Sequence, residues 1–200
     1  MTAQTEGGTG GLPVEGLPPW QRARRERIID AGLAVLRQHE YERIQIRDVA
    51  EAADVARATL YRYFASKDHL YACVLQKWSA LDRPDPALRK ATAEERVRTW
   101  IRRLIRAFER EPQFFRASLA LQHSADPEAT RILAEMSLAS LSRLTQHLAV
   151  LGPDRAADAA DILFSIVNWG SMRAIFHGGD MKKVYRLADR FIDSLAPELR

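Results

Sequence analysis

The residues with the most informative chemistry lie between positions 57 and 63, in the run RATLYRY. Arg57 and Arg62 are forked hydrogen-bond donors, while Thr59 and Tyr61 carry hydroxyl groups. Phosphate oxygens accept hydrogen bonds from such side chains, and base edges in the major groove pair with forked or small donors. If these residues share the exposed face of a helix, that face is suited to contact DNA.

The flanking sequence predicts the elements that would position these donors. Apolar residues recur at helical spacing over 46–53, the pattern breaks at Asp54, and a second short helix is predicted from Arg57 to Tyr63 with Leu60 and Phe64 facing inward. Two short helices joined by a tight turn form a helix-turn-helix, whose second helix lies in the major groove. A helical hairpin packed in a core is the alternative, which the polar residues of this turn disfavour.

The run Thr59-Leu60-Tyr61-x-Tyr63-Phe64-x-Ser66-Lys67 resembles the signature of the TetR family of one-component regulators, and the similarity covers 27–75 closely. The resemblance implies an amino-terminal three-helix DNA-binding domain, a divergent helical ligand-binding domain and a homodimer. It also implies a set of residues that contact double-stranded DNA, the last of which would hold a phosphate: Arg47, Arg57, Ala58, Thr59, Tyr61, Arg62, Tyr63 and Lys67.

Further cations crowd the start of the predicted first helix, namely Arg22, Arg24, Arg25 and Arg27. Cations at this end oppose the helix dipole, and a DNA backbone nearby would offset that cost. We therefore predict phosphate contacts from Arg22, Arg24 and Arg25, with a solvated tail as the alternative. The chain has a net charge of only +4, so the placement of the cations is more informative than their number.

Three positions depart from the residues usual in the family. Glu40, at the end of the first helix, and Asp54, in the turn, stand where Gly is usual, and Gln45 stands where Thr precedes the second helix. Asp tolerates a positive φ better than most residues, whereas Glu would be costly in a left-handed cap and Gln is a weaker N-cap than Thr. These departures affect the helix ends rather than the function.

The absence of strand-like alternation predicts an all-α fold, and the chain divides into about nine predicted helices. Of the 200 residues, 46% are hydrophobic, which is enough for a sizeable core. Four parts are expected: a disordered tail at 1–19, the helix-turn-helix domain at 20–66, a connecting helix at 67–83, and a ligand-binding and dimerisation domain at 84–200. The helices of the last part are expected near 92–109, 112–123, 127–151, 153–177 and 180–195. Thr92 and Glu95 are spaced as a capping box.

Several function classes are disfavoured by the sequence. Cys73 is the one cysteine, which fits a reducing cytoplasm and excludes an intramolecular disulfide. The first nineteen residues lack the pattern of a secretory signal, and the longest uncharged run of the most apolar helix, 162–172, is far shorter than the roughly 20 residues of a membrane span. We find no nucleophile elbow and no helix-borne histidine pair, so we expect no catalysis, metal or cofactor.

The segment 162–176 is apolar nearly all round, so it must be covered on every side. One side carries Leu163, Ile166, Gly170 and Arg173, and another carries Phe164, Val167, Ser171 and Ile175. The sequence leaves open which side meets a partner subunit. Together with Val184, Leu187, Phe191 and Leu195 of the last helix, the segment predicts a homodimer through helices eight and nine, which resembles the family arrangement. A monomeric bundle is the alternative.

The family resemblance further implies a cavity for a small hydrophobic ligand in the carboxy-terminal domain. Large apolar residues and a few polar ones are the candidates for its lining, with ordinary core packing as the alternative. The candidates are Trp100, Phe108, Phe115, Leu119, His123, Phe164, Asn168, Trp169 and Met172. The arginines of 96–110 are expected to pair with acids on a solvated face, and an anionic ligand end near Arg103 or Arg106 is the alternative.

The layout of the chain, including Arg62-Tyr63-Phe64 and the helix after Glu111, is similar to actinobacterial regulators of sterol and lipid catabolism. That likeness implies a bulky apolar acid or its thioester as the ligand. We therefore predict a cytoplasmic, dimeric repressor that a small hydrophobic molecule releases from a palindromic operator. Two alternatives stay open: a DNA-binding architectural or division-control protein without an inducer, and a helical small-molecule binding module.

Overall fold

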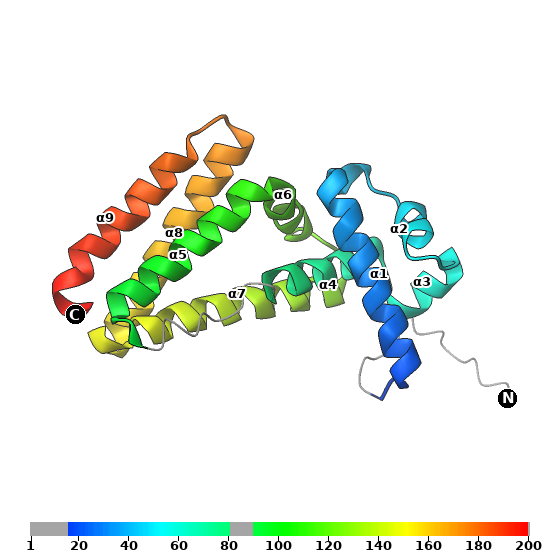
Figure 1. Cartoon of the computed structure of the whole chain (residues 1–200), viewed down its shortest axis with the longest axis horizontal. Coiled ribbons are helices and arrows are strands. Elements are labelled where there is room, and N and C mark those ends of the chain that lie inside the picture. The colour runs from blue at the N-terminus through cyan, green and yellow to red at the C-terminus, as the bar shows by residue number, and fades with distance from the viewer. Residues whose placement is uncertain (1–15, 81–89, 200) are drawn as a thin grey trace, which may run out of the picture. The chain divides into compact units, whose positions relative to one another are not determined.

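The computed structural model describes residues 16–80 and 90–199, and the regular elements in these ranges are helices. The α-helices are α1 (Pro19–Gln38), α2 (Ile46–Ala52), α3 (Arg57–Tyr63), α4 (Lys67–Ala80), α5 (Ala93–Arg110), α6 (Pro112–Leu121), α7 (Pro127–His147), α8 (Pro153–Phe176) and α9 (Met181–Leu199), with short 3-10 helices η1 (Tyr41–Arg43) and η3 (Ala149–Leu151) (Figure 1). The prediction of an all-α fold is confirmed for the described residues.

The described residues form two compact units. The amino-terminal unit contains 16–79 together with 116–133, and the carboxy-terminal unit contains the rest. The four-part division predicted from the sequence assigns each part a single continuous range, so it does not include the grouping of 116–133 with the amino-terminal residues. That division stays a prediction. Most of the tail expected at 1–19 and the end of the connecting helix expected at 67–83 fall on residues 1–15 and 81–89, outside the described ranges. Within the described residues, α1 already begins at Pro19 and Leu17 is buried.

The core of the amino-terminal unit is built from the inward faces of its helices. Ile28 of α1, Val49 of α2 and Leu60 of α3 are fully buried, and α2 packs against both α1 and α3. At Gly32, a Cβ would lie 2.9 Å from Cγ2 of Val74, so α1 and α4 approach too closely for a side chain at this position. These contacts hold α3 in place against the rest of the unit.

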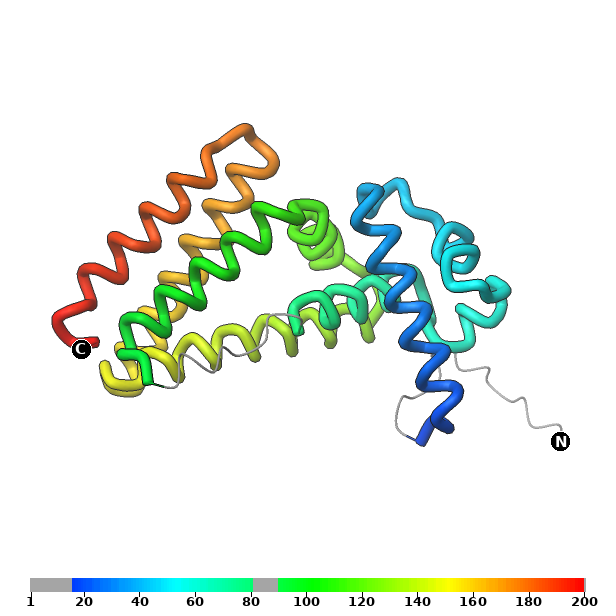
Figure 2. The backbone as a smooth tube through the Cα atoms, in the orientation of Figure 1, coloured from blue at the N-terminus to red at the C-terminus, as the bar shows by residue number. Residues whose placement is uncertain are grey.

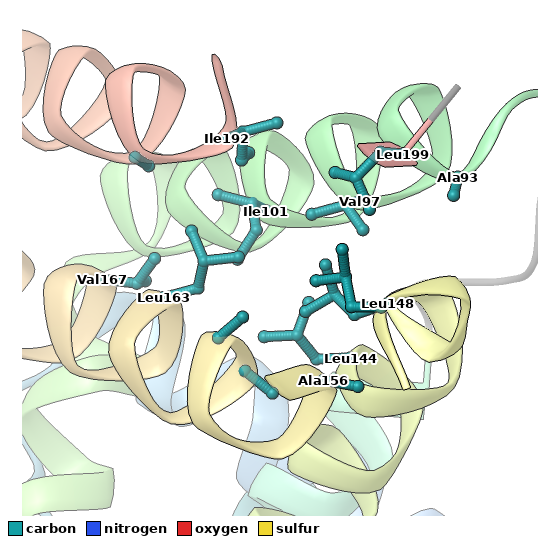
Figure 3. Close-up of a cluster of buried hydrophobic side chains, with 14 of the residues drawn as sticks. Ala93, Val97, Ile101, Leu144, Leu148, Ala156, Leu163, Val167, Ile192 and Leu199 are labelled. Carbon is teal, nitrogen blue, oxygen red and sulfur yellow. The ribbon is translucent and has the colours of Figure 1, made fainter. Parts of the chain in front are cut away.

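The carboxy-terminal unit is a helical bundle in which α5, α8 and α9 lie side by side (Figures 1 and 2). Figure 3 shows its core, where Ile101 of α5, Leu163 and Val167 of α8 and Ile192 of α9 point toward one another. All of these side chains are at most 1% exposed. The apolar stripes predicted by helical spacing therefore pack inward within this unit.

Some helix ends differ from the sequence-based expectation. α7 ends at His147 rather than near 151, because η3 takes over and Gly152 then reverses the chain with a φ of 84°. α9 extends past 195 to Leu199 with Pro197 inside its last turn. Proline removes one backbone hydrogen bond there, while Leu199 is buried and packs that turn on the core.

Candidate nucleic-acid interface

The helix-turn-helix predicted at 46–63 is present with the predicted bounds of its second helix. Asp54 in the turn has a φ of 52°, as expected for a residue that stands where Gly is usual. The backbone N–H of Val55 donates to the carbonyl oxygen of Ala50 at 3.0 Å, which closes the turn. Glu40 has a φ of −69°, so the left-handed cap considered for it is not formed.

The start of α2 has Gln45 where Thr is usual in the family, and the side chain that caps it belongs to another residue. The backbone N–H of Gln45 donates to Oδ2 of Asp48 at 2.8 Å. Asp48 also lies 3.5 Å from Nε of Arg47, whose side chain remains 63% exposed. The acid that orders α2 therefore also orients Arg47.

The residues of α3 divide into an open face and an inward face. Arg57, Ala58 and Arg62 are exposed, Tyr61 is 45% exposed and Thr59 is half-buried. Tyr63 was predicted on the open face, but it is only 4% exposed. That placement was wrong, because Tyr63 follows Leu60 by three residues and so shares its buried side of the helix.

The arginines at the start of α1 have different surroundings. Arg22 is exposed, and the guanidinium of Arg24 lies 5.3 Å from the ring of Trp20, an exposed side chain that sequence reasoning missed. Arg25 lies over the ring of Phe64 at 5.0 Å and donates to Sγ of Cys73 at 3.1 Å. The guanidinium of Arg25 is thus held within the unit, which does not fit its prediction as a phosphate ligand.

Lys67 opens α4 as predicted, but its ammonium group already has partners. Nζ donates to the carbonyl oxygen of Tyr41 at 2.5 Å and lies 4.2 Å from the centroid of the Tyr41 ring. Burial lowers the pKa of Lys67, although Asp68 opposes the shift. An ammonium has three donors, so a phosphate contact from Lys67 stays a prediction that would use the donors left over.

The first turn of α4 is joined to the α6–α7 turn by two hydroxyl–carboxylate pairs, which we call the α4 clasp. Ser66 Oγ donates to Oδ2 of Asp126 at 2.5 Å, and Ser124 Oγ donates to Oδ2 of Asp68. The hydroxyl of Tyr41 donates to the other oxygen of Asp68. The clasp lies within the amino-terminal unit and explains why 116–133 belongs to it.

Asp126 also serves as the N-cap of α7, since it accepts hydrogen bonds from the backbone N–H groups of Glu128 at 2.9 Å and Ala129 at 3.1 Å. Burial alone would raise the pKa of Asp126, but the hydrogen bonds from Ser66, Ala129 and Glu128 outweigh it and lower that pKa. The carboxylate is therefore held in its charged form.

His69 is a buried titratable group in the same region. Its Nδ1 accepts the backbone N–H of Ala65 at 3.2 Å, and its ring meets that of Phe64 edge to face. Burial lowers the pKa of His69, while the nearby Asp126 opposes the shift. The neutral imidazole is thus part of the connection between α3 and α4.

The candidate ligand residues divide between the two units. Leu119, half-buried, and His123, exposed, lie in the amino-terminal unit. In the carboxy-terminal unit, Phe115 is buried and its ring centroid lies 4.7 Å from that of Phe108. The half-buried candidates there are Trp100, Phe108, Phe164, Asn168 and Met172. Trp169 is 63% exposed, unlike the others.

The faces of α8 differ from both sides considered from the sequence. Val167 and Ser171, which were placed on a possible partner side, are fully buried in the chain itself. The exposed large apolar residues of α8 are Ile162, Trp169 and Phe176, which recur every seven residues. The open face that they form borders the side of Ile166 and Arg173 and lies opposite Val167 and Ser171.

The arginines of α5 were expected to pair with acids, and the structure shows this for Arg98 and Arg102. Arg98 contacts Asp193 at 2.6 Å and Glu94 at 2.9 Å, and Arg102 contacts Asp189 at 2.7 Å. The pairs with Asp193 and Asp189 join α5 to α9, whereas the pair with Glu94 lies within α5. An anionic ligand end near Arg103 or Arg106 stays a prediction.

The described residues contain no helix with the length and hydropathy of a membrane span, and no His, Cys, Asp and Glu side chains among them are grouped to bind a metal ion.

Comparison with known proteins points to one family. Residues 28–74 match the model of the bacterial regulatory proteins of the tetR family. The HTH-type transcriptional repressor KstR of Mycobacterium tuberculosis is 40% identical over 112 residues, which cover 54% of this chain and 51% of that repressor. The KstR of Rhodococcus jostii is 38% identical over 54% of this chain and 52% of its own length. The chain thus spans about half the length of these relatives.

Solved structures extend the likeness over most of the chain. A TetR transcriptional regulator from Rhodococcus sp. RHA1 has a TM-score of 0.70 at 22% identity, covering 88% of this chain and 96% of that one. The transcriptional regulator FadR from Bacillus subtilis, solved in complex with stearoyl-CoA, has a TM-score of 0.65 at 18% identity, covering 88% and 99%. At these identities the likeness shows a shared fold.

Proposed function

We propose that the chain is a dimeric transcriptional repressor of the TetR family that a small hydrophobic molecule releases from a palindromic operator, because residues 28–74 match the family model and KstR repressors are similar over about half of the chain. The observation that carries the proposal is the exposed face of α3, the second helix of the helix-turn-helix. This face presents Arg57, Tyr61 and Arg62. Such a face supplies the forked and hydroxyl donors that read base edges and phosphates.

The proposed DNA-contacting set has two residues fewer than the full set predicted from the sequence, because Tyr63 and Arg25 are left out. Arg57, Ala58, Thr59, Tyr61 and Arg62 form the base-reading face of α3 in this proposal. Backbone phosphates would be bound by the cations around α3, namely Arg22, Arg24, Arg47 and Lys67. Tyr63 and Arg25 act inside the unit, where the first is buried and the second supports Phe64.

A homodimer through α8 and α9 is supported by the open face of α8. Ile162, Trp169 and Phe176 form an apolar stripe, and Leu187 of α9 is also exposed. A two-fold dimer presents one α3 to each half of a palindrome. Trp169→Asp should therefore yield a monomer in analytical ultracentrifugation and lose palindrome binding, whereas Leu138→Asp, at an exposed leucine of α7, should stay dimeric.

The proposed inducer is a bulky apolar acid or its thioester. Support comes from the similarity to KstR repressors and from the shared fold with a FadR that was solved with stearoyl-CoA. The half-buried aromatic residues of α5 and α8 provide adaptable apolar surface for such a molecule. The regulator would act on DNA in the cytoplasm.

The decisive experiment selects a bound palindrome from a random library and measures its Kd over a range of salt concentrations. Arg57→Ala should weaken binding by about 10- to 100-fold, since a base contact is worth about 1–3 kcal/mol. Arg131→Ala, an arginine paired with Glu128 in the same unit, is the charge-matched control and should bind nearly as the wild type. Unchanged binding of Arg57→Ala at every base would overturn the assignment of α3.

Release of the bound DNA is then measured with fatty acids, sterol acids and their coenzyme A thioesters. Release by one of these classes supports the sensing function. If no compound class weakens binding of the palindrome, the result would instead favour a DNA-binding architectural or division-control protein without an inducer.

A further inference from the structure

Three consecutive residues of α8 face three different environments. Trp169 is exposed, Gly170 faces α9, and Ser171 is fully buried. A Cβ at Gly170 would lie 3.0 Å from both methyl carbons of Val184, so the contact with α9 fixes the rotation of α8 at this level. Because successive helical residues differ by about 100°, Ser171 points away from the exposed face, along the line of the core residues Leu163 and Val167.

Among the described residues of the carboxy-terminal unit, Ser171 has the one buried side-chain oxygen without a hydrogen-bond partner. The hydroxyl of Thr145 and the amide of Asn168, by contrast, bond back to their own helices: Thr145 donates to the carbonyl oxygen of Leu141 at 3.0 Å, and Asn168 donates to that of Phe164 at 2.9 Å. Such back-bonding is the ordinary solution for a hydroxyl in a helix, and Ser171 does not use it.

A buried hydroxyl without a partner destabilises the fold, and native proteins contain few of them. Ordered water is a poor solution here, because a buried water requires two to four polar partners, and the line on which Ser171 lies continues in Leu163 and Val167. Alanine at this position would fold more favourably. The serine therefore makes physical sense if a molecule that enters the unit provides the missing partner.

We propose that Ser171 Oγ donates a hydrogen bond to an uncharged oxygen, a carbonyl or hydroxyl, of an otherwise apolar ligand. The inference rests on the proposed sensing function and specifies the chemistry of its ligand. One hydroxyl cannot compensate the desolvation of a buried carboxylate, which needs several donors or a cation. An acid or thioester group of the same ligand would therefore lie elsewhere, and Ser171 would recognise a second, neutral oxygen.

The first test uses the ligand-free, full-length protein. Ser171→Ala should raise Tm by about 2–4 °C, because it removes an unsatisfied buried group. Thr145→Val, which removes a hydroxyl that is already bonded to the backbone, is the matched control and should leave Tm unchanged or lower it. A fall of Tm in Ser171→Ala would show that the hydroxyl has a partner in the folded chain and would overturn the inference.

The second test compares ligands that differ by one oxygen: hexadecan-2-one with hexadecane, and 5α-cholestan-3-one with 5α-cholestane. Wild type should bind at least one ketone roughly tenfold more tightly than its hydrocarbon. Ser171→Ala should abolish this preference, and Ser171→Thr should retain it. A preference that survives in Ser171→Ala, or its absence in the wild type, would overturn the inference.

The two proposals fail in different ways. If a fatty acyl or sterol acyl thioester releases DNA equally from wild type and Ser171→Ala while no ketone is preferred, the repressor function stands and the role of Ser171 is wrong. If the chain binds no palindrome but the ketone preference depends on Ser171, the role of Ser171 stands and the repressor function is wrong.

Discussion

The open face of α3 and the first turn of α4 follow one another in the chain, yet their polar side chains are used differently. On α3, Arg57, Tyr61 and Arg62 are exposed. At the start of α4, Ser66 and Asp68 are bonded to the α6–α7 turn, and Lys67 is bonded to the carbonyl of Tyr41. A side chain that contacts DNA must be available, whereas one that sets the direction of a helix must be tied. The two adjacent segments separate these requirements.

The largest expected effect is on stability and comes from opening the α4 clasp. Asp126→Ala removes the cap of α7 and leaves the Ser66 hydroxyl without its acceptor. Loss of a cap costs about 1 kcal/mol, and a broken, partly buried hydrogen bond to a charged group costs about 1–2 kcal/mol more. We expect the free energy of unfolding, measured by urea denaturation, to fall by about 2–3 kcal/mol.

Asp180→Ala is the matched control for this prediction, because Asp180 accepts the backbone N–H of Lys182 at 2.8 Å at the exposed start of α9. It should cost about 1 kcal/mol, the value of a cap alone. Equal losses in the two variants would mean that the clasp adds nothing to the cap, and the contrast between α3 and α4 would lose its energetic basis.

Lys67 tests whether one residue can both stabilise the fold and contact DNA. Lys67→Ala removes the bond to the Tyr41 carbonyl and the cation–π contact, so we expect a loss of stability of about 1–2 kcal/mol. If its remaining donors bind a phosphate, the DNA affinity should also fall for all sequences alike, with a flatter salt dependence. Arg57→Ala should lower affinity without lowering stability.

Binding of Lys67→Ala with a wild-type salt dependence would place Lys67 wholly on the structural side. The same measurement on Arg62→Ala, at an exposed residue of α3, provides the reference for a residue that acts on DNA alone.

The comparison also shows which features a sequence can predict. The bounds of α3, the positive φ of Asp54 and the capping box of Thr92 with Glu95 follow from neighbouring residues, and the structure confirms them. The clasp joins Ser66 and Asp126 across 60 positions, so no local pattern indicates it.

The structure holds two residues of the predicted DNA-contacting set inside the amino-terminal unit. Arg25 was assigned to DNA by its residue type and position, but a tertiary contact with Cys73 holds it. Tyr63 was assigned by family resemblance, although its spacing of three from the inward Leu60 was a sign of burial. The orphaned hydroxyl of Ser171 could be seen in the sequence as a polar residue in an apolar line, but its lack of a partner could not.

The third prediction concerns pH, through His69 at the junction of α3 and α4. Its pKa is lower in the folded chain than the usual value of about 6.5. Between these two values the unfolded chain binds a proton that the folded chain does not, so stability falls as the pH drops below about 6.5. Asp126 and Glu128 favour the protonated form, and Arg25 and Arg131 disfavour it.

His69→Asn keeps an acceptor for the backbone N–H of Ala65 but does not titrate. Its stability should therefore change less than that of the wild type between about pH 7.5 and 5.5, with a difference in slope of at most about 1.4 kcal/mol per pH unit. His147, whose pKa burial also lowers, contributes equally to both proteins. A wild-type slope in His69→Asn would exclude His69 as the titrating group.

The smallest expected effect is at Asp54, which joins α2 to the open face of α3. Its φ of 52° is a left-handed conformation that Gly adopts at lower cost than Asp. Gly also increases the freedom of the unfolded chain, and each effect is about 0.5–1 kcal/mol. Asp54→Gly should therefore change the free energy of unfolding by less than about 0.5 kcal/mol, while Asp54→Val should lower it by about 1–2 kcal/mol. Because the bond from Val55 to Ala50 remains, Asp54→Gly should bind DNA as the wild type does. A weakened affinity in this variant would mean that α3 depends on its own turn for its position as well as on the α4 clasp.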